Sequence, residues 1–328
     1  MGVCVFTTSR RAPGAWIGAL LLLLPVLCGA AEPQAPAWAY PVNPPGFTPR
    51  AETGIPQQVP GSSASYTITQ LRDRFIAPVW HPDEHPPLPP IVAEGRKPSV
   101  YACGFCHRAD GPGGPENSSL AGLPAAYIVQ QVAEFRSGAR KTSVPGRNVD
   151  LMIALVQDLT DAELQAAADY FAALKPRRNL EVRETTTVPV TEVAGWFLAA
   201  KEEAGTEPLG QRIIEVPKHL EQFENRDTHA AFIAWVPVGS VARGMALAQS
   251  GGDGKTLPCA TCHGTELRGL NGTPSIAGRS PSYLMRQLWD IKHGARAGTN
   301  AVLMQPVVAN LAETDMMDLV AYLATLEP

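Results

Sequence analysis

The stretches of sequence that decide the fold are Cys103-Gly104-Phe105-Cys106-His107 and Cys259-Ala260-Thr261-Cys262-His263. Both follow C-x-x-C-H, the pattern that attaches c-type haem. The two thiols lie about one helical turn apart, so each can add to a vinyl group of the porphyrin, and the adjacent histidine can then bind the iron. The sequence therefore predicts two covalently attached haem c groups, held by Cys103, Cys106, Cys259 and Cys262, with His107 and His263 as iron ligands.

Two other uses of paired cysteines fit this pattern less well. A structural zinc site joins C-x-x-C elements that lie about 15–20 residues apart, whereas 152 residues separate Cys106 from Cys259. The first copy is faintly similar to a dithiol redox motif. Such a motif explains neither the histidine in both copies nor the lack of a strand–helix–strand pattern around them.

The second motif also begins an internal repeat. A shift of 156 residues aligns the two copies, and four residues then drop out of the second copy, so that the shift becomes 152. The matching pairs include Tyr127 and Tyr283, Gln131 and Gln287, Arg140 and Arg296, and Met152 and Met304. A repeat of this kind predicts one structural unit used twice.

Met152 and Met304 are the predicted sixth ligands of the two irons. A haem iron that already binds one histidine accepts a thioether, which favours the ferrous state and raises the potential. Met152 is the only methionine between residues 2 and 244. The remaining internal methionines have no partner in the first repeat and are expected to pack in the core; they are Met245, Met285, Met316 and Met317.

Capping signals predict where the helices begin and end. A helix follows each motif, between Pro124 and Gly138 in the first copy and from Ser280 to Gly294 in the second. A closing helix then carries apolar residues at helical spacing. These residues are Leu164, Ala167, Ala168, Phe171 and Leu174, and in the repeat Met316, Leu319, Val320, Leu323 and Leu326.

The two closing helices differ at their N-caps. Thr160 and Glu163 form a capping-box signature, whereas Ala312 stands at the equivalent cap of the repeat. Alanine offers no side-chain acceptor, and this difference should cost the second helix about 1 kcal/mol.

These features together resemble the class I c-type cytochromes, in particular their two-domain di-haem members. The resemblance covers about 90–176 and 237–328. It implies that an N-terminal helix crosses the C-terminal one and that a proline carbonyl holds the proximal histidine. Pro274 suits this role for His263, but Ser118 stands at the matching position in the first copy, so the acceptor for His107 stays open.

The resemblance also suggests a role for the paired arginines. Arg140 and Arg296 either pair with haem propionates, as the family implies, or remain solvated at their helix ends.

The expected fold class is mainly α, with two tandem cytochrome c-like helical haem domains, a proline-rich N-terminal arm and a small β-containing insertion. The arm is expected to be extended apart from a short helix near 66–75, and the insertion to contain strands at 180–190 and 212–216. The expected domains are a signal peptide 1–31, the arm 32–89, haem domain 1 at 90–176, the insertion 177–236 and haem domain 2 at 237–328.

Histidines outside the two motifs suggest no further metal site. His81 and His85 are four residues apart, but the prolines around them exclude the helix that would place both on one face. His219 and His229, in the insertion, are expected to be surface residues.

Residues 1–31 are typical of an export signal. Arg10 and Arg11 precede an apolar run at 15–26, and Gly29-Ala30-Ala31 is a small-residue cleavage site. The run is short for a membrane span, so we expect a soluble periplasmic or otherwise exported protein, with an uncleaved anchor as the alternative. Removing the segment leaves 25 Lys and Arg against 31 Asp and Glu, a net charge of −6. Because the chain has no net basic charge, nucleic acid is not expected as a partner.

The expected function is transfer of single electrons between exported or membrane redox partners, such as a dehydrogenase, an oxidase or a membrane complex. Histidine and methionine ligands on each iron leave no open position, so no small-molecule substrate is expected. Two alternatives stay open. A di-haem peroxidase-type enzyme would need a displaceable sixth ligand and an acid–base group, and a cytochrome subunit of an exported dehydrogenase would only accept electrons.

Overall fold

The computed structural model describes residues 34–201 and 203–328. The predicted signal peptide, 1–31, therefore lies outside the described residues. Ala35–Pro328 form one compact unit, so the domain boundaries expected inside it stay predictions. Within the described part of the chain, no helix is both long and apolar enough to cross a membrane.

The N-terminal arm is mostly extended and is held by aromatic side chains. Trp38 and Tyr40 are buried in the largest core cluster, and Trp80, which is 1% exposed, anchors a smaller one. The short helix expected near 66–75 is confirmed as α1. A capping box formed by Thr67 and Gln70 fixes its start. The helical segments of this part are α1 (Ile68–Arg72), the 3₁₀ helix η1 (Pro82–Glu84) and α2 (Pro90–Ala93).

The segment predicted to bind the first haem, 90–176, is called the first haem unit, and it is helical. Its helices are α3 (Cys103–His107), α4 (Ala125–Ser137), α5 (Asn148–Leu155) and α6 (Asp161–Ala173). As predicted, α4 ends at Gly138, whose φ of 74° lies in the left-handed region that glycine adopts without strain. The predicted capping box of Thr160 and Glu163 starts α6, and the predicted apolar face of this helix is buried against residues of α4.

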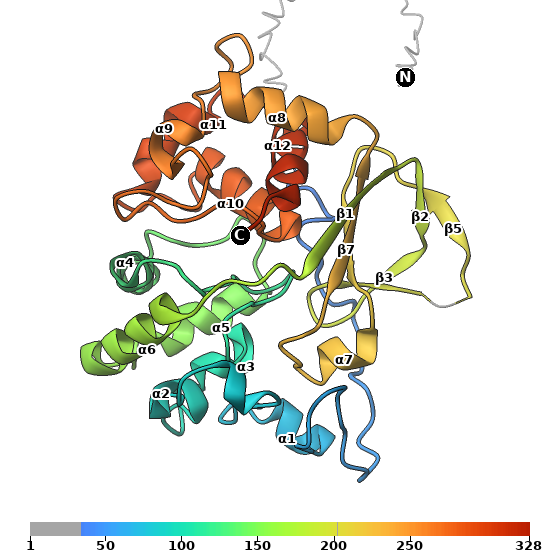
Figure 1. The fold of residues 1–328 in the computed structure, drawn as a ribbon, viewed down its shortest axis with the longest axis vertical. Coiled ribbons are helices and arrows are strands. Elements are labelled where there is room, and N and C mark those ends of the chain that lie inside the picture. Colours follow the sequence, from blue (N-terminus) through green and yellow to red (C-terminus); the bar gives the residue numbers. More distant parts are fainter. Residues whose placement is uncertain (1–33, 202) are drawn as a thin grey trace, which may run out of the picture. The chain divides into compact units, whose positions relative to one another are not determined.

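The insertion forms a small sheet and two short strand pairs (Figure 1). In the sheet, β7 lies between β1, which runs parallel to it, and β6, which runs antiparallel. The run predicted at 180–190 is extended but divides into two strands, β1 and β2, which pair with different partners. Strand β6 confirms most of the run predicted at 212–216, and β7 was not predicted. The elements are β1 (Leu180–Thr185), β2 (Thr187–Pro189), β3 (Thr191–Val193), β4 (Leu198–Ala200), β5 (Thr206–Pro208), β6 (Ile214–Pro217), α7 (Leu220–Glu224) and β7 (Phe232–Pro237).

The segment predicted to bind the second haem, 237–328, is called the second haem unit. It begins and ends with two helices that pack on each other, α8 and α12 (Figure 1). They meet at Gly244, where an added Cβ would lie 1.9 Å from the Asp318 carbonyl oxygen. Beside this contact, Arg243 donates to both carboxylate oxygens of Asp318 at 2.7 and 3.0 Å. The helical elements are α8 (Ser240–Ser250), α9 (Ala260–His263), α10 (Pro281–Lys292), η2 (Ala301–Met304), α11 (Gln305–Val308) and α12 (Glu313–Thr325).

Most of the methionines expected in the core are found there. Met285, Met316 and Met317 are buried. The prediction is wrong for Met245, which is 42% exposed, because it lies on the outer side of α8 rather than on the face that packs against α12.

The insertion and the second haem unit share one core. Leu180 of β1 and Phe232 of β7 lie in the same cluster as Leu284 of α10 and Leu319 of α12. The fold is therefore mixed helix and strand. The expected class, mainly α, is corrected because the strands form part of the main core. The physical reason is that the insertion supplies apolar sheet residues to a common interior instead of lying outside a helical protein.

Candidate haem-binding sites

The first C-x-x-C-H motif forms the single-turn helix α3, packed closely against the chain before it. A Cβ on Gly104 would lie 2.8 Å from the Ala77 Cβ and 2.9 Å from the Val92 carbonyl oxygen. His107 Nδ1 lies 2.9 Å from the Ser118 carbonyl oxygen. That oxygen can only accept, so Nδ1 donates to it and Nε2 keeps its lone pair. The acceptor that the sequence left open is thus Ser118.

The environment of His107 favours the neutral ring. Burial lowers the pKa of this histidine, because a charged imidazolium is poorly solvated away from water. A neutral imidazole is the form that binds a metal ion. Both the tautomer and the charge state of His107 therefore suit an iron ligand.

A cavity of about 610 Å³ lies beside α3. His107 of α3 and Met152 of α5 both line it, as do Cys103 and Cys106. Much of the remaining wall is apolar and includes Leu123, Ile128, Phe135, Leu164 and Phe171. A large apolar cavity that presents an imidazole, a thioether and two thiols fits a covalently bound haem in size and in donor chemistry.

Distant parts of the chain complete this cavity. The arm, the insertion and α10 contribute Phe47, Trp196, Phe223 and Tyr283. Arg226, after α7, places its guanidinium carbon 3.6 Å from the Phe105 ring centroid and donates to the Phe105 carbonyl oxygen at 2.9 Å. Sequence reasoning missed Phe47, Trp196, Phe223 and Arg226, because none of them belongs to a motif or to the repeat. It paired Tyr283 with Tyr127 but did not place it at the first site.

The second motif is arranged in a similar way around α9. His263 is 7% exposed, and its Nδ1 lies 2.8 Å from the Pro274 carbonyl oxygen, which is the acceptor that the resemblance implied. Burial lowers the pKa of His263 as well. Cys259 packs against the largest core cluster, whereas Met304, at the end of η2, packs half-buried against Ile291 and its neighbours. The role of Met304 stays a prediction.

A polar network joins the two haem units through residues that the repeat pairs. Arg140 donates to Tyr283 Oη at 3.2 Å and to Gln287 Oε1 at 3.0 Å. Arg296 donates in return to Tyr127 Oη and to Gln131 Oε1, both at 2.9 Å. The network consists of Tyr127, Gln131, Arg140, Tyr283, Gln287 and Arg296. Neither Arg140 nor Arg296 is solvated at the end of its helix, because each side chain donates hydrogen bonds to the opposite unit.

Comparison with known proteins finds a family profile, curated relatives and a solved structure that are similar to this chain. The cytochrome c family profile matches residues 241–327. Cytochrome c4 of Azotobacter vinelandii is 30% identical over 232 residues, which cover 68% of this chain and 84% of that protein. The thiosulfate dehydrogenase electron acceptor of Thiomonas intermedia is 25% identical over 232 residues, which cover 69% and 79%. Among solved structures, thiosulfate dehydrogenase from Marichromatium purpuratum aligns with a TM-score of 0.47 and 28% identity, over 69% of this chain and 37% of that one.

Proposed function

Because the chain belongs to the di-haem class I c-type cytochromes, we propose that it binds two haem c groups and carries single electrons between exported redox proteins. The observation that carries this proposal is the placement of His107 and Met152 on the walls of one cavity, together with both cysteines of the first motif. The export signal expected at 1–31 supports a periplasmic or otherwise exported location.

The proposed ligands follow the repeat. Cys103 and Cys106 hold the first haem, with His107 and Met152 on its iron. The second set is Cys259, Cys262, His263 and Met304. When bound, haem c supplies a reversible one-electron couple between ferric and ferrous iron. The chain orients each proximal imidazole through a backbone carbonyl and lines much of the first site with apolar side chains.

An electron carrier is favoured over a peroxidase-type enzyme. Such an enzyme needs an open or displaceable sixth position on one iron. Met152 lines the same cavity as His107, and Met304 takes the equivalent position in the repeat. The repeat therefore predicts a thioether ligand for both irons.

A second candidate role is that of an electron-accepting subunit for an exported dehydrogenase. It is favoured by the similarity to the Thiomonas intermedia protein, which is named as such an acceptor and aligns across most of its own length. The mature chain carries a net charge of −6, so a basic surface on the donor would speed encounter, and added salt would slow it.

The ligand assignment can be tested by replacing each methionine. The oxidised protein should show the weak near-infrared sulfur-to-iron band at the intensity of two haems. Met152→Ala and Met304→Ala should each remove about half of this band and lower one of the two reduction potentials, because a thioether favours ferrous iron.

The matched control is Met245→Ala, which changes an exposed methionine that has no partner in the first repeat. It should leave the band and both potentials unchanged. A high-spin ferric signal in the unaltered protein, accompanied by peroxide turnover, would instead support the enzyme. A mass increase of fewer than two haems would contradict the proposed stoichiometry.

A further inference from the structure

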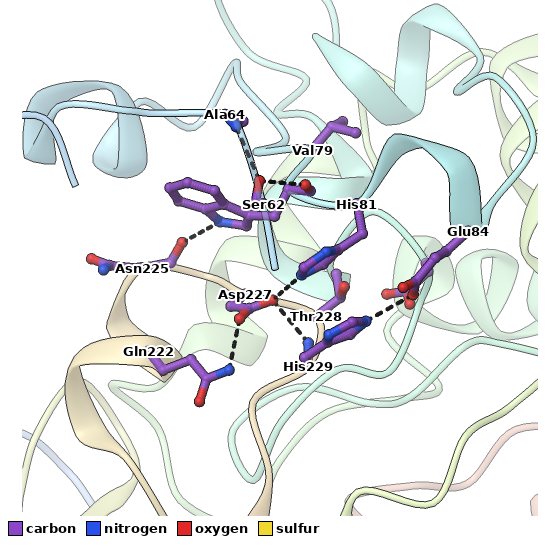
Figure 2. Close-up of polar contacts among 12 residues, drawn as sticks. Ser62, Ala64, Val79, His81, Glu84, Gln222, Asn225, Asp227, Thr228 and His229 are labelled. Atoms are coloured by element: carbon purple, nitrogen blue, oxygen red, sulfur yellow. Dashed lines mark hydrogen bonds and ion pairs between the residues drawn. The ribbon is translucent and has the colours of Figure 1, made fainter. Parts of the chain in front are cut away.

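A second group of metal-ligating side chains lies where the arm meets the insertion (Figure 2). It consists of His81, Glu84 and His229, whose ligand atoms all lie within 4.8 Å of one another. None of the three lines the haem cavity. His81 is buried, whereas Glu84 and His229 are exposed, so the group has a fixed inner side and an open outer side through which an ion can enter.

His81 is held by a buried carboxylate. Asp227 is 1% exposed, and its Oδ1 lies 2.9 Å from His81 Nε2 and accepts the His229 backbone N–H at 3.0 Å. Its Oδ2 accepts from Gln222 Nε2 at 2.7 Å. A carboxylate that binds one ring nitrogen fixes the tautomer and leaves Nδ1 of His81 with its lone pair, as behind histidine ligands of metal sites.

The other two side chains can adjust. The rings of His81 and His229 are stacked, with centroids 3.7 Å apart and planes inclined by 7°. His229 Nε2 lies 2.8 Å from Glu84 Oε2. Bond lengths to zinc of about 2.0–2.2 Å place neighbouring donors of a tetrahedral site about 3.3 Å apart. The lone pair of a ring nitrogen lies in the plane of the ring, so two stacked imidazoles do not point at one ion. To bind the same ion as His81, the exposed His229 has to turn out of the stack and release Glu84.

The charges around the group also favour a cation. Arg177 is the positive group that pairs with Glu84, and it pairs with Asp110 as well. If Glu84 turns toward an ion, Asp110 can keep Arg177 neutralised. Asp227 adds a second carboxylate directly behind the ligands.

We propose that His81, Glu84 and His229 bind one divalent transition-metal ion, with Asp227 as the positioning residue for His81. Two imidazoles and one carboxylate suit zinc, nickel or copper(II) better than the oxygen-loving magnesium and calcium. The ion would join η1 of the arm to the segment after α7. That same segment carries Arg226, which lines the haem cavity.

The test is calorimetric titration of the haem-loaded protein with Zn²⁺. One equivalent is expected to bind. Glu84→Gln and His229→Asn should each weaken binding by about tenfold or more, and Asp227→Asn by about 10–100-fold, as for other groups that orient a ligand. Because Glu84 and His229 are exposed, their variants should fold, and an unchanged haem absorption spectrum would verify this. X-ray absorption at the zinc edge should report two imidazoles.

The matched control is His219→Gln, which removes an exposed histidine of the insertion outside the group, and it should bind Zn²⁺ as the unaltered protein does. The proposal is overturned if the folded protein takes up no stoichiometric Zn²⁺. It is equally overturned if the Glu84 and His229 variants bind it unchanged. These outcomes do not depend on the haem ligands, so they leave the electron-transfer proposal standing.

Discussion

At the scale of single residues, Gly244 shows how one missing side chain sets a helix contact. In an open helix, Gly→Ala stabilises a protein by about 1 kcal/mol. Here the new Cβ would stand 1.9 Å from the Asp318 carbonyl oxygen and 2.9 Å from the Tyr322 Cβ, and backbone on α12 cannot move cheaply. We expect Gly244→Ala to lower the free energy of unfolding by about 1–3 kcal/mol, measured by urea denaturation.

A glycine placed on the open side of the same helix provides the control for this prediction. Ala242 is exposed, so Ala242→Gly should lose about 1 kcal/mol through helix propensity alone. If Gly244→Ala raised stability instead, the tight contact between α8 and α12 would be incorrect.

At the scale of elements, the two closing helices differ in their first turn. Asp315 accepts the Ala312 backbone N–H at 2.8 Å, but alanine cannot return a bond, whereas Thr160 accepts from the Glu163 backbone N–H. Ala312→Ser should supply the missing acceptor and raise the free energy of unfolding by about 1 kcal/mol. Thr160→Ala should lower it by a similar amount. Thermal or urea unfolding would measure both, and a neutral Ala312→Ser would show that Asp315 alone satisfies this helix end.

At the scale of the whole molecule, Glu215 connects the insertion to the second haem unit. From β6 it accepts the Ser280 hydroxyl at 2.7 Å and the Ser282 N–H at 3.1 Å, at the start of α10. Burial raises the pKa of Glu215 above its ordinary value of 4.5. The folded state thus binds this proton more tightly than the unfolded chain. Protonated Glu215 therefore adds to the free energy of unfolding. This contribution is complete below about pH 4.5 and is lost as the pH rises through the raised pKa.

Glu215→Gln isolates this effect, because glutamine keeps an acceptor oxygen and does not ionise. The stability of the unaltered protein minus that of the variant should fall as the pH rises from about 4 to 8, measured by urea unfolding at several pH values. A difference that stays constant or grows with pH would show that burial does not raise the pKa of Glu215.

The sequence predicted the features that are local in the chain. The C-x-x-C-H motifs, the capping box at Thr160 and the apolar face of α6 each depend on residues a few positions apart, and the structure has all three. The alignment of the repeat paired Arg140 with Arg296 but could not show that each reaches into the opposite unit.

Contacts between distant segments lay beyond such reasoning. Prolines correctly argued against a shared helical face for His81 and His85, yet His81 meets His229, 148 positions later. Nothing in the spacing of either histidine indicates that contact, because it depends on the arm folding back over the insertion. The cavity walls supplied by Trp196 and Phe223 were unpredictable for the same reason.

The composite wall of the first cavity limits how this protein could be taken apart or recombined. A fragment that stops near residue 176 keeps the motif and Met152 but loses Trp196, Phe223 and Tyr283 from the wall. A chimaera that grafts in only a foreign 90–176 segment would have to match surfaces belonging to the recipient's arm, sheet region and α10. The transferable piece is therefore the helical unit together with the surroundings that enclose it.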